Sequence, residues 1–357
     1  MDSGNSSQTT NEYDLDISDE VTELVRLICY VIISPIVSVL GILTNMVNSW
    51  IYYKHGLSES VNISFLTLAF TDLAGLICCI WYGIGMSPLL ATRTDLSFDS
   101  MDVTYITGAF PRVFFTKVTC WITVYISLER CFCIVAPLHV RTMITPKRTI
   151  FILTVLYAAG AIVNFPVLYL GGLFLFWKTD FLHNRTFLGL GYRDDYFSVN
   201  SVTTSVNAIT FLTSFIVIVV TTIALTVALQ RKSKWRQNSS KSTVKDARNL
   251  SKRDTTLSKT IVLLSAVLIV SYLPYTTNCV LMSRLDGFQL YGKYNNFFIV
   301  MWSFSWMFET LNSTTSLFIY YNMSTKYKET FKHLVPSFCC SVLEVWKRHC
   351  QSLFKQL

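Results

Sequence analysis

Long stretches without charged residues alternate with short polar segments along most of the chain. A helix rises about 1.5 Å per residue, so roughly 20 apolar residues cross the roughly 30 Å of hydrocarbon in a bilayer. Four charge-free stretches reach this length, namely those between Arg26 and Lys54, Arg148 and Lys178, Asp195 and Arg231, and Lys259 and Arg284. Each of them predicts a membrane-spanning helix.

Three further stretches reach this length if internal charges are allowed. They are about 61–88 around Asp72, 103–136 around Arg112 and Lys117, and 295–320 around Glu309. Charges inside a membrane are costly, so these four residues become candidates for function. The pattern predicts an all-α membrane protein, a seven-transmembrane helix bundle with spans at about 25–53, 61–88, 103–136, 147–174, 199–230, 258–284 and 295–320.

A tail flanks the predicted bundle on each side. Residues 1–24 carry seven acidic residues and no Lys or Arg. They lack the apolar core of a cleavable signal peptide, so we expect the first span to insert as an uncleaved anchor. In the other tail, 321–357, residues 324–334 place Tyr327, Phe331 and Leu334 at helical spacing with lysines between them. This pattern predicts a short amphipathic eighth helix on the inner leaflet, in contact with membrane lipid.

Basic residues are concentrated on one side of the seven-span arrangement. Ten Lys and Arg lie between Arg231 and Lys259, on the same side as Lys54, Lys147 and the lysines of the last tail. Because cytoplasmic loops retain Lys and Arg, the amino terminus is predicted to lie outside the cell. The protein is expected in the plasma membrane. The formal charge of +8 then reflects inner loops that also suit anionic lipid, and not a nucleic-acid surface.

The cysteines lie in or beside the spans and in the last tail, and none lies in an outer loop. An extracellular disulfide framework is therefore not supported. Adjacent Cys339 and Cys340 suggest palmitoylation, with unmodified thiols as the alternative. Asn5 and Asn184 begin glycosylation sequons on the predicted outer side.

The end of the third predicted span carries the most specific motif. Residues 127–138 read Ser-Leu-Glu-Arg-Cys-Phe-Cys-Ile-Val-Ala-Pro-Leu. This resembles the acidic-Arg-aromatic motif and the Ile-Val-x-Pro-Leu run of rhodopsin-like (class A) G-protein-coupled receptors, with Cys131 in place of the usual Tyr. The resemblance implies that Glu129 restrains Arg130 at rest, and that Arg130 meets a heterotrimeric G protein when the sixth span moves outward. The alternative is a simple ion pair at the membrane edge.

The same resemblance implies further partners. An extracellular peptide or small-molecule ligand would bind from the outside. The third inner loop, 231–258, mixes Ser and Thr with basic residues, a flexible composition that suits a kinase substrate. We therefore expect a receptor kinase and arrestin to act at this loop and at the tail.

Residues 68–72, Leu-Ala-Phe-Thr-Asp, are similar to the family's Leu-Ala-x-x-Asp in the second span, and Asn45 stands where the family keeps an Asn in the first. The family uses this Asp to hold an allosteric sodium ion. The matching positions here are Thr119, Asn312, Ser313 and Ser316, whose oxygens suit a hard cation beside Asp72. A water-filled polar cluster without sodium is the alternative, and no other cofactor is expected.

The sixth and seventh spans keep part of the family's switch motifs. Residues 312–320 resemble Asn-Ser-x-x-Asn-Pro-x-Ile-Tyr with Tyr320 in place, but Ser316 and Leu317 replace the Asn-Pro pair. Without that Pro, the local bend of the helix is in doubt. Residues 271–274 resemble Cys-Trp-x-Pro, with Tyr272 at the place of the Trp and Pro274 retaining the kink.

Several departures mark the chain as a divergent member of this family. Tyr105 stands where the third span usually begins with a Cys, the fourth span has Tyr157 where a Trp is expected, and the fifth lacks the usual Pro. This erosion is similar to that of invertebrate peptide and candidate chemosensory orphan receptors.

Arg112 lies eighteen residues before Arg130, so the two share a helix face about 27 Å apart. It should point into the outer half of the bundle, where we expect it to bind a ligand carboxylate. The expected pocket comprises Arg112, Lys117, Tyr275, Trp306 and Glu309. The alternative is that Arg112 or Lys117 pairs internally with Glu309.

Other classes of membrane protein fit less well. All five histidines fall in predicted loops or the tail, which disfavours a buried His-metal centre and an enzyme. No Lys lies between Lys293 and Lys326, so a retinal Schiff base in the seventh span is ruled out. The rival is a transporter or channel that uses Asp72, Arg112, Lys117 and Glu309, although the paired broken helices of transporters are not found.

Overall fold

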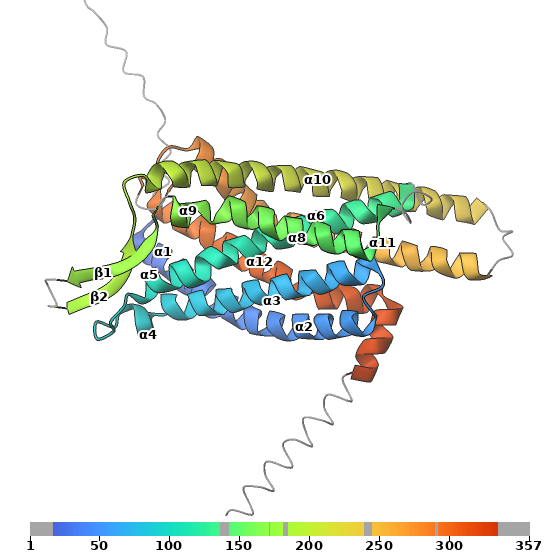
Figure 1. The fold of residues 1–357 in the computed structure, drawn as a ribbon, viewed down its shortest axis with the longest axis horizontal. Helices are drawn as coiled ribbons and strands as arrows, with labels where there is room; N and C mark the ends of the chain where they lie inside the picture. Colours follow the sequence, from blue (N-terminus) through green and yellow to red (C-terminus); the bar gives the residue numbers. More distant parts are fainter. Residues whose placement is uncertain are drawn as a thin grey trace, which may run out of the picture.

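A computed structural model of the chain describes residues 17–135, 143–170, 172–180, 185–238, 245–289 and 292–334. Long helices run side by side, and a β-hairpin projects from one end of the bundle (Figure 1). We call this the hairpin end and the opposite end, where α6 finishes, the Arg130 end. The predicted modification sites Asn5, Asn184, Cys339 and Cys340 lie outside the described residues, as do Pro137 and Leu138.

The described helices make seven crossings of the bundle. They comprise α1 (Asp19–Arg26), η1 (Leu27–Ile33) and α2 (Ser34–Lys54); α3 (Ser60–Met86); α5 (Ser100–Thr104), η2 (Tyr105–Ala109) and α6 (Phe110–Val135); α8 (Pro146–Asn164) and α9 (Pro166–Tyr169); α10 (Tyr196–Asn238); α11 (Lys245–Arg284); and α12 (Asn295–Met323). A short α4 (Pro88–Ala91) follows α3. The fold confirms the predicted seven-helix bundle.

Among the described residues, five crossings are long and apolar enough to span a membrane by length and composition alone. The other two are built on α6 and α12, which have 26 and 29 residues. Four charged residues interrupt α6, and α12 is rich in Asn, Ser and Thr. These two helices therefore bring many of the buried polar groups into the interior of the bundle.

Local signals explain where several helices begin. Ser18 caps α1, Asp99 caps α5 through the backbone N–H of Asp102 at 3.0 Å, and Thr145 caps α8. Such side chains satisfy backbone donors that have no partner in the first helical turn. Pro146 occupies the first turn of α8, where its missing N–H costs nothing, whereas Pro274 lies inside α11.

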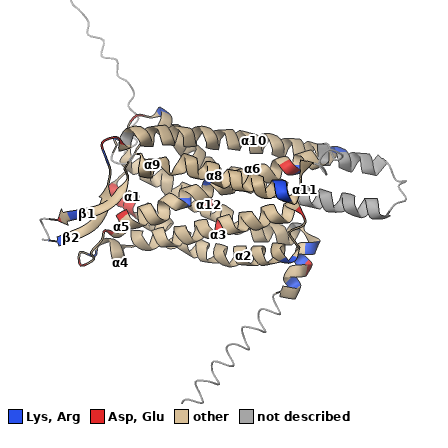
Figure 2. Cartoon of the chain, viewed as in Figure 1, with Lys and Arg blue, Asp and Glu red and all other residues tan. Residues whose placement is uncertain are grey.

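The bundle is apolar on the outside and polar within. Leu43, Phe151 and Ile162 are more than half exposed, whereas Asn45 and Asn278 are fully buried. Charged residues in view lie mainly at the two ends (Figure 2). A helix satisfies its own backbone in lipid, so its apolar side chains can face the hydrocarbon while polar side chains pair inside.

The hairpin was not predicted. Strand β1 (Phe174–Asp180) pairs antiparallel with β2 (Arg185–Gly191), so that Phe174 lies opposite Gly191. The fourth crossing accordingly ends at Tyr169, about one turn before the predicted limit near residue 174. Residues 174–177 are aromatic and apolar, and a short run of this kind suits a strand as well as the end of a helix.

The last helix spans residues 325–334, close to the predicted amphipathic segment 324–334. It turns away from the axis of α12 at the Arg130 end (Figure 1). Tyr327 is buried there, and the lysines of the segment are on its exposed side. The two long helices α10 and α11 continue beyond the predicted spans, 199–230 and 258–284, at the same end.

Candidate functional site

The Glu129–Arg130 pair lies near the Arg130 end of α6. The guanidinium of Arg130 donates to the Glu129 carboxylate, and both residues are buried. One turn away, the hydroxyl groups of Ser127 and Ser265 lie 3.0 Å apart and connect α6 to α11. The second oxygen of Glu129 and Nε of Arg130 have no hydrogen-bond partner among the described residues. Glu129 and Arg130 thus bind each other, and each has one further polar atom that could bind another partner.

A second cluster surrounds Asp72 in the middle of the bundle, and we call it the Asp72 network. It comprises Asp72, Thr119, Asn45, Asn48, Ser313 and Ser316. The hydroxyls of Thr119 and Ser313 donate to the same oxygen of Asp72, at 2.8 and 3.1 Å. Nδ2 of Asn45 donates to the backbone oxygen of Ser313 at 2.7 Å. These bonds join α2, α3, α6 and α12.

Two of the expected sodium ligands therefore hydrogen-bond Asp72, and the other two make no hydrogen bond to it among the described residues. Ser316 accepts a hydrogen bond from Asn48 at 2.9 Å instead. Within the described residues, the side chain of Asn312 makes no hydrogen bond to Asp72. The carboxylate of Asp72 and the hydroxyls of Thr119 and Ser313 remain a donor set of the kind that hard cations prefer.

A third cluster, the Arg112 cluster, lies toward the hairpin end and comprises Arg112, Lys117 and Glu309. All three residues are almost fully buried. Glu309 accepts a hydrogen bond from Thr116 at 3.1 Å, and Lys117 donates to Oδ1 of Asn207 on α10 at 2.6 Å. No ion pair within 4.0 Å links the members of the cluster among the described residues.

Arg112 points toward α3 and α12. Its Nη2 donates to Thr310 at 3.4 Å, and its guanidinium carbon lies 5.9 Å from the ring centre of Trp306. Gly75 makes this position accessible, because a Cβ at Gly75 would lie 2.7 Å from Nη1 of Arg112. Nε of Arg112 has no hydrogen-bond partner in the described part of the chain. Two buried cations of α6 therefore diverge, Arg112 toward α12 and Lys117 toward α10.

The aromatic residues predicted around this cluster occupy separate places. Tyr275 packs between Phe211 and Trp302, with ring centres 4.3 and 5.2 Å apart. Trp306 instead donates to Sγ of Cys79 at 3.1 Å on the side facing α3.

Of the predicted switch residues, Tyr272 donates to the backbone oxygen of Thr116 at 3.1 Å. Tyr320 packs at the Arg130 end.

Three residues that contact the Arg112 cluster were not predicted from the sequence. Asn207 and Thr116 hydrogen-bond the buried ions, and Gly75 makes room for one of them. A weak signal was present for Asn207, since an amide side chain inside a charge-free span needs a polar partner. Nothing in the sequence indicates that Gly75 lies on the face of α3 that meets Arg112.

The hairpin is attached to the bundle by hydrogen bonds to the segment that leads into the third crossing. Oδ2 of Asp102 accepts from the backbone N–H of Leu190 at 2.8 Å and lies 3.8 Å from Nζ of Lys178. The backbone of Leu188 pairs with Ser97 and Asp99, both at 2.8 Å. The described cysteines are all free.

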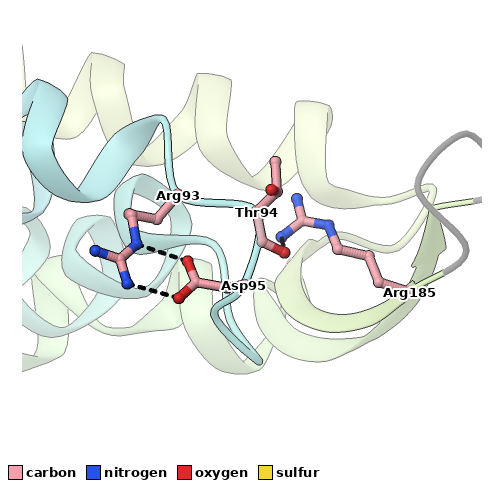
Figure 3. A network of polar contacts seen from close by, with 4 residues as sticks. All are labelled: Arg93, Thr94, Asp95 and Arg185. Atoms are coloured by element: carbon pink, nitrogen blue, oxygen red, sulfur yellow. Dashed lines mark hydrogen bonds and ion pairs between the residues drawn. The ribbon is translucent and has the colours of Figure 1, made fainter.

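A smaller contact holds the loop between α4 and α5 (Figure 3). Arg93 makes two hydrogen bonds of 2.6 Å to the carboxylate of Asp95, and Arg185 donates to the backbone oxygen of Thr94 at 2.9 Å. Hydrogen bonding by Arg93 lowers the pKa of Asp95 to about 2. The pair is therefore ionised at any physiological pH.

Seven helix crossings, apolar outside and with buried ions inside, are the architecture of a multi-pass membrane protein, and a closed acidic-Arg pair lies at one end. The profile of the family described as 7 transmembrane receptor (rhodopsin family) matches residues 44–320, most of the chain. The chain therefore belongs to the rhodopsin family of seven-transmembrane receptors. A comparison with curated proteins finds no match. Members of this family are in general receptors and not enzymes.

Proposed function

We propose that this receptor binds an acid-bearing ligand, such as a peptide terminus or another organic acid, from the hairpin end. We further propose that it activates a heterotrimeric G protein at the Arg130 end. The orientation follows from charge: residues 1–24 are acidic, whereas Lys54, Arg148 and the lysines of 325–334 lie at the Arg130 end. Retention of Lys and Arg in the cytoplasm supports an orientation with the hairpin end outside the plasma membrane.

The observation that carries G-protein coupling is the buried Glu129–Arg130 pair in a chain of this family. Both residues lie on one helix, so Arg130 can leave Glu129 for another acceptor by a change in its own side-chain conformation. In the proposed active state Arg130 leaves Glu129 and contacts the G protein.

The observation that favours an acidic ligand is the state of Lys117. Its ammonium is buried and hydrogen-bonds a neutral amide, and no carboxylate lies within 4.0 Å among the described residues. A buried cation is stabilised strongly by a carboxylate, and a ligand acid can supply one. Arg112 adds a second donor, since its Nε has no partner in the described residues.

The test begins with a cell assay of G-protein activation against a library of short peptides and organic acids. Replacing Arg130 by Ala should reduce activation to background at equal surface expression. Replacing Lys117 by Gln should weaken the potency of an acidic agonist about 10- to 100-fold, the usual effect of losing a charge-assisted hydrogen bond. The amide analogue of the same agonist should lose potency on the unmodified receptor and not on Lys117→Gln.

Three results would contradict this function. Activation that survives Arg130→Ala would remove the proposed role of the pair. Agonists whose potency is unchanged when Lys117 and Arg112 are replaced would contradict the proposal of an acid-bearing ligand. Ion currents or uptake without G-protein activation would favour the transporter or channel that the buried ions also allow.

The remaining predicted features attach to this proposal. A sodium ion beside Asp72, Thr119 and Ser313 would act as an allosteric ligand. Receptor kinase and arrestin would act at the loop 231–258, and the tail would be anchored by acylation at Cys339 and Cys340. Each of these sites needs its own test.

A further inference from the structure

Tyr327 joins the last helix, 325–334, to the interior of the bundle. Its hydroxyl donates to Oδ1 of Asn48 on α2 at 2.5 Å. Its ring packs on Tyr320 and Tyr52, with ring centres 5.6 and 5.9 Å apart, and only 1% of the residue is exposed. Burial also raises the pKa of Tyr327, so that the phenol stays protonated and acts as the donor.

Asn48 continues the contact inward. Its Nδ2 donates to Oγ of Ser316 at 2.9 Å and to Oδ1 of Asn45 at 3.3 Å. Asn45 donates to the backbone oxygen of Ser313 at 2.7 Å, and the Ser313 hydroxyl donates to Asp72 at 3.1 Å. A path of hydrogen bonds, joined through Ser313 itself, therefore runs from the carboxylate of Asp72 to the helix 325–334.

The spacing along the chain makes this path geometrically natural. Asn45 and Asn48 are three residues apart on α2, and Ser313 and Ser316 are three residues apart on α12. Residues at this spacing share a helix face, so two polar pairs face each other across the α2–α12 contact. Loss of a hydrogen bond between buried polar groups leaves its partners unsatisfied, so breaking one of these bonds weakens the contact between the two helices.

We infer that Asn48 and Tyr327 are positioning residues that couple the helix 325–334 to the Asp72 network and favour the conformation in which Arg130 stays paired with Glu129. The bond exists in the structure in which that ion pair is closed. A bond formed in one conformation shifts the equilibrium toward that conformation by its differential strength. The signalling part of this inference rests on the proposed coupling to a G protein; the physical coupling does not.

The first experiment measures the coupling alone, by hydrogen–deuterium exchange on the purified full-length receptor in detergent. Tyr327→Phe removes only the hydroxyl. We expect faster exchange in 325–334 and also around Asn45 in α2 and Ser313 in α12. Tyr321→Phe is the matched control, because Tyr321 lies at the same end and packs on Phe331 outside the chain of hydrogen bonds. A change confined to 325–334 would overturn the inference.

The second experiment measures ligand-independent nucleotide exchange on a G protein at equal receptor number. Tyr327→Phe should raise it about threefold to tenfold, the range expected from one net hydrogen bond. Asn48→Val should raise it at least as much, and the double variant should add little, since both changes break the same chain. Loss of packing alone would lower signalling whether or not Arg130 is present. A rise that comes from release of Arg130 must instead vanish when Arg130→Ala is added.

The two failures are distinguishable. If the unmodified receptor activates no G protein under any ligand while the exchange experiment succeeds, the proposed function fails and the coupling stands. If it signals but Tyr327→Phe matches Tyr321→Phe in both experiments, the inference fails and the proposed function stands.

Discussion

The Asp72 network in the middle of the bundle and the Arg112 cluster toward the hairpin end satisfy their buried polar groups in different ways. In the Asp72 network, amide, hydroxyl and carboxylate groups hydrogen-bond one another directly. In the Arg112 cluster, three buried ions each take a neutral partner from a different helix. The first arrangement stabilises one packing of the helices, and the second leaves Arg112 and Lys117 without an ion-pair partner within 4.0 Å in the described part of the chain.

The same difference appears outside the helices. The helix 325–334 is fixed by a fully buried tyrosine, whereas the hairpin is attached by backbone hydrogen bonds and partly exposed ion pairs. Partly exposed contacts open at low cost, and ligand-binding segments are commonly drawn from such regions. We therefore expect changes at the hairpin end to alter ligand access more than folding, with one exception at Gly75.

Gly75 tests how tightly the buried ions are held. In Gly75→Ala the new Cβ would lie 2.7 Å from Nη1 of Arg112, so the guanidinium has to move within a closed interior. Adding a methyl group to a packed core costs about 1–3 kcal/mol, and we expect a fall of this size in the free energy of unfolding. The thermal midpoint of the purified receptor in detergent measures it.

The control for this variant is Gly160→Ala, whose Cβ would lie nearest to the side chains of Val118 and Phe114, at 3.1 and 3.2 Å. It should cost less, because no ion has to move. Combining Gly75→Ala with Arg112→Met should recover part of the loss, since the shorter side chain vacates the space. An unchanged midpoint for Gly75→Ala would mean that Arg112 is not fixed where the structure has it.

The number and order of the helices follow from the sequence because a bilayer sets the length of each span. Charge-free runs alone predict α8, α10 and α11, and Glu129 and Arg130 are neighbours in any helix. The family resemblance also named Thr119 and Ser313 as neighbours of Asp72, and both hydrogen-bond it.

Other features depend on contacts that no local pattern encodes. Tyr327 and Asn48 are 279 positions apart, and only the packing of α12 beside α2 brings them together. The hairpin was missed because its first strand continues an apolar run that length alone assigns to the fourth span. The direction of Arg112 depends on a missing side chain at Gly75, on another helix.

Asp102 tests the attachment of the hairpin. Asp102→Ala removes the acceptor of the Leu190 N–H and the partner of Lys178, and we expect a local cost of about 1 kcal/mol. Hydrogen exchange of 174–180 and 185–191 should accelerate several-fold, while exchange in α2 and α12 stays as it was. Asp102→Asn keeps an acceptor oxygen and should lie between Ala and the unmodified receptor. Equal exchange in all three would show that Asp102 does not hold the hairpin.

The smallest effect is expected at Asp95, on the same surface. Its contact with Arg93 is exposed, and ion pairs in solvent contribute little to stability. Because the folded pKa of about 2 lies below the ordinary value of 3.8, any contribution is complete above about pH 4 and is lost as the pH falls through 2. Asp95→Asn should therefore leave the thermal midpoint unchanged at pH 7 and at pH 5, and agonist potency with it. A loss of potency in Asp95→Asn would instead place the loop around Arg185 and Thr94 in the path of the ligand, and the hairpin end would then be a more ordered entrance than its exposed contacts indicate.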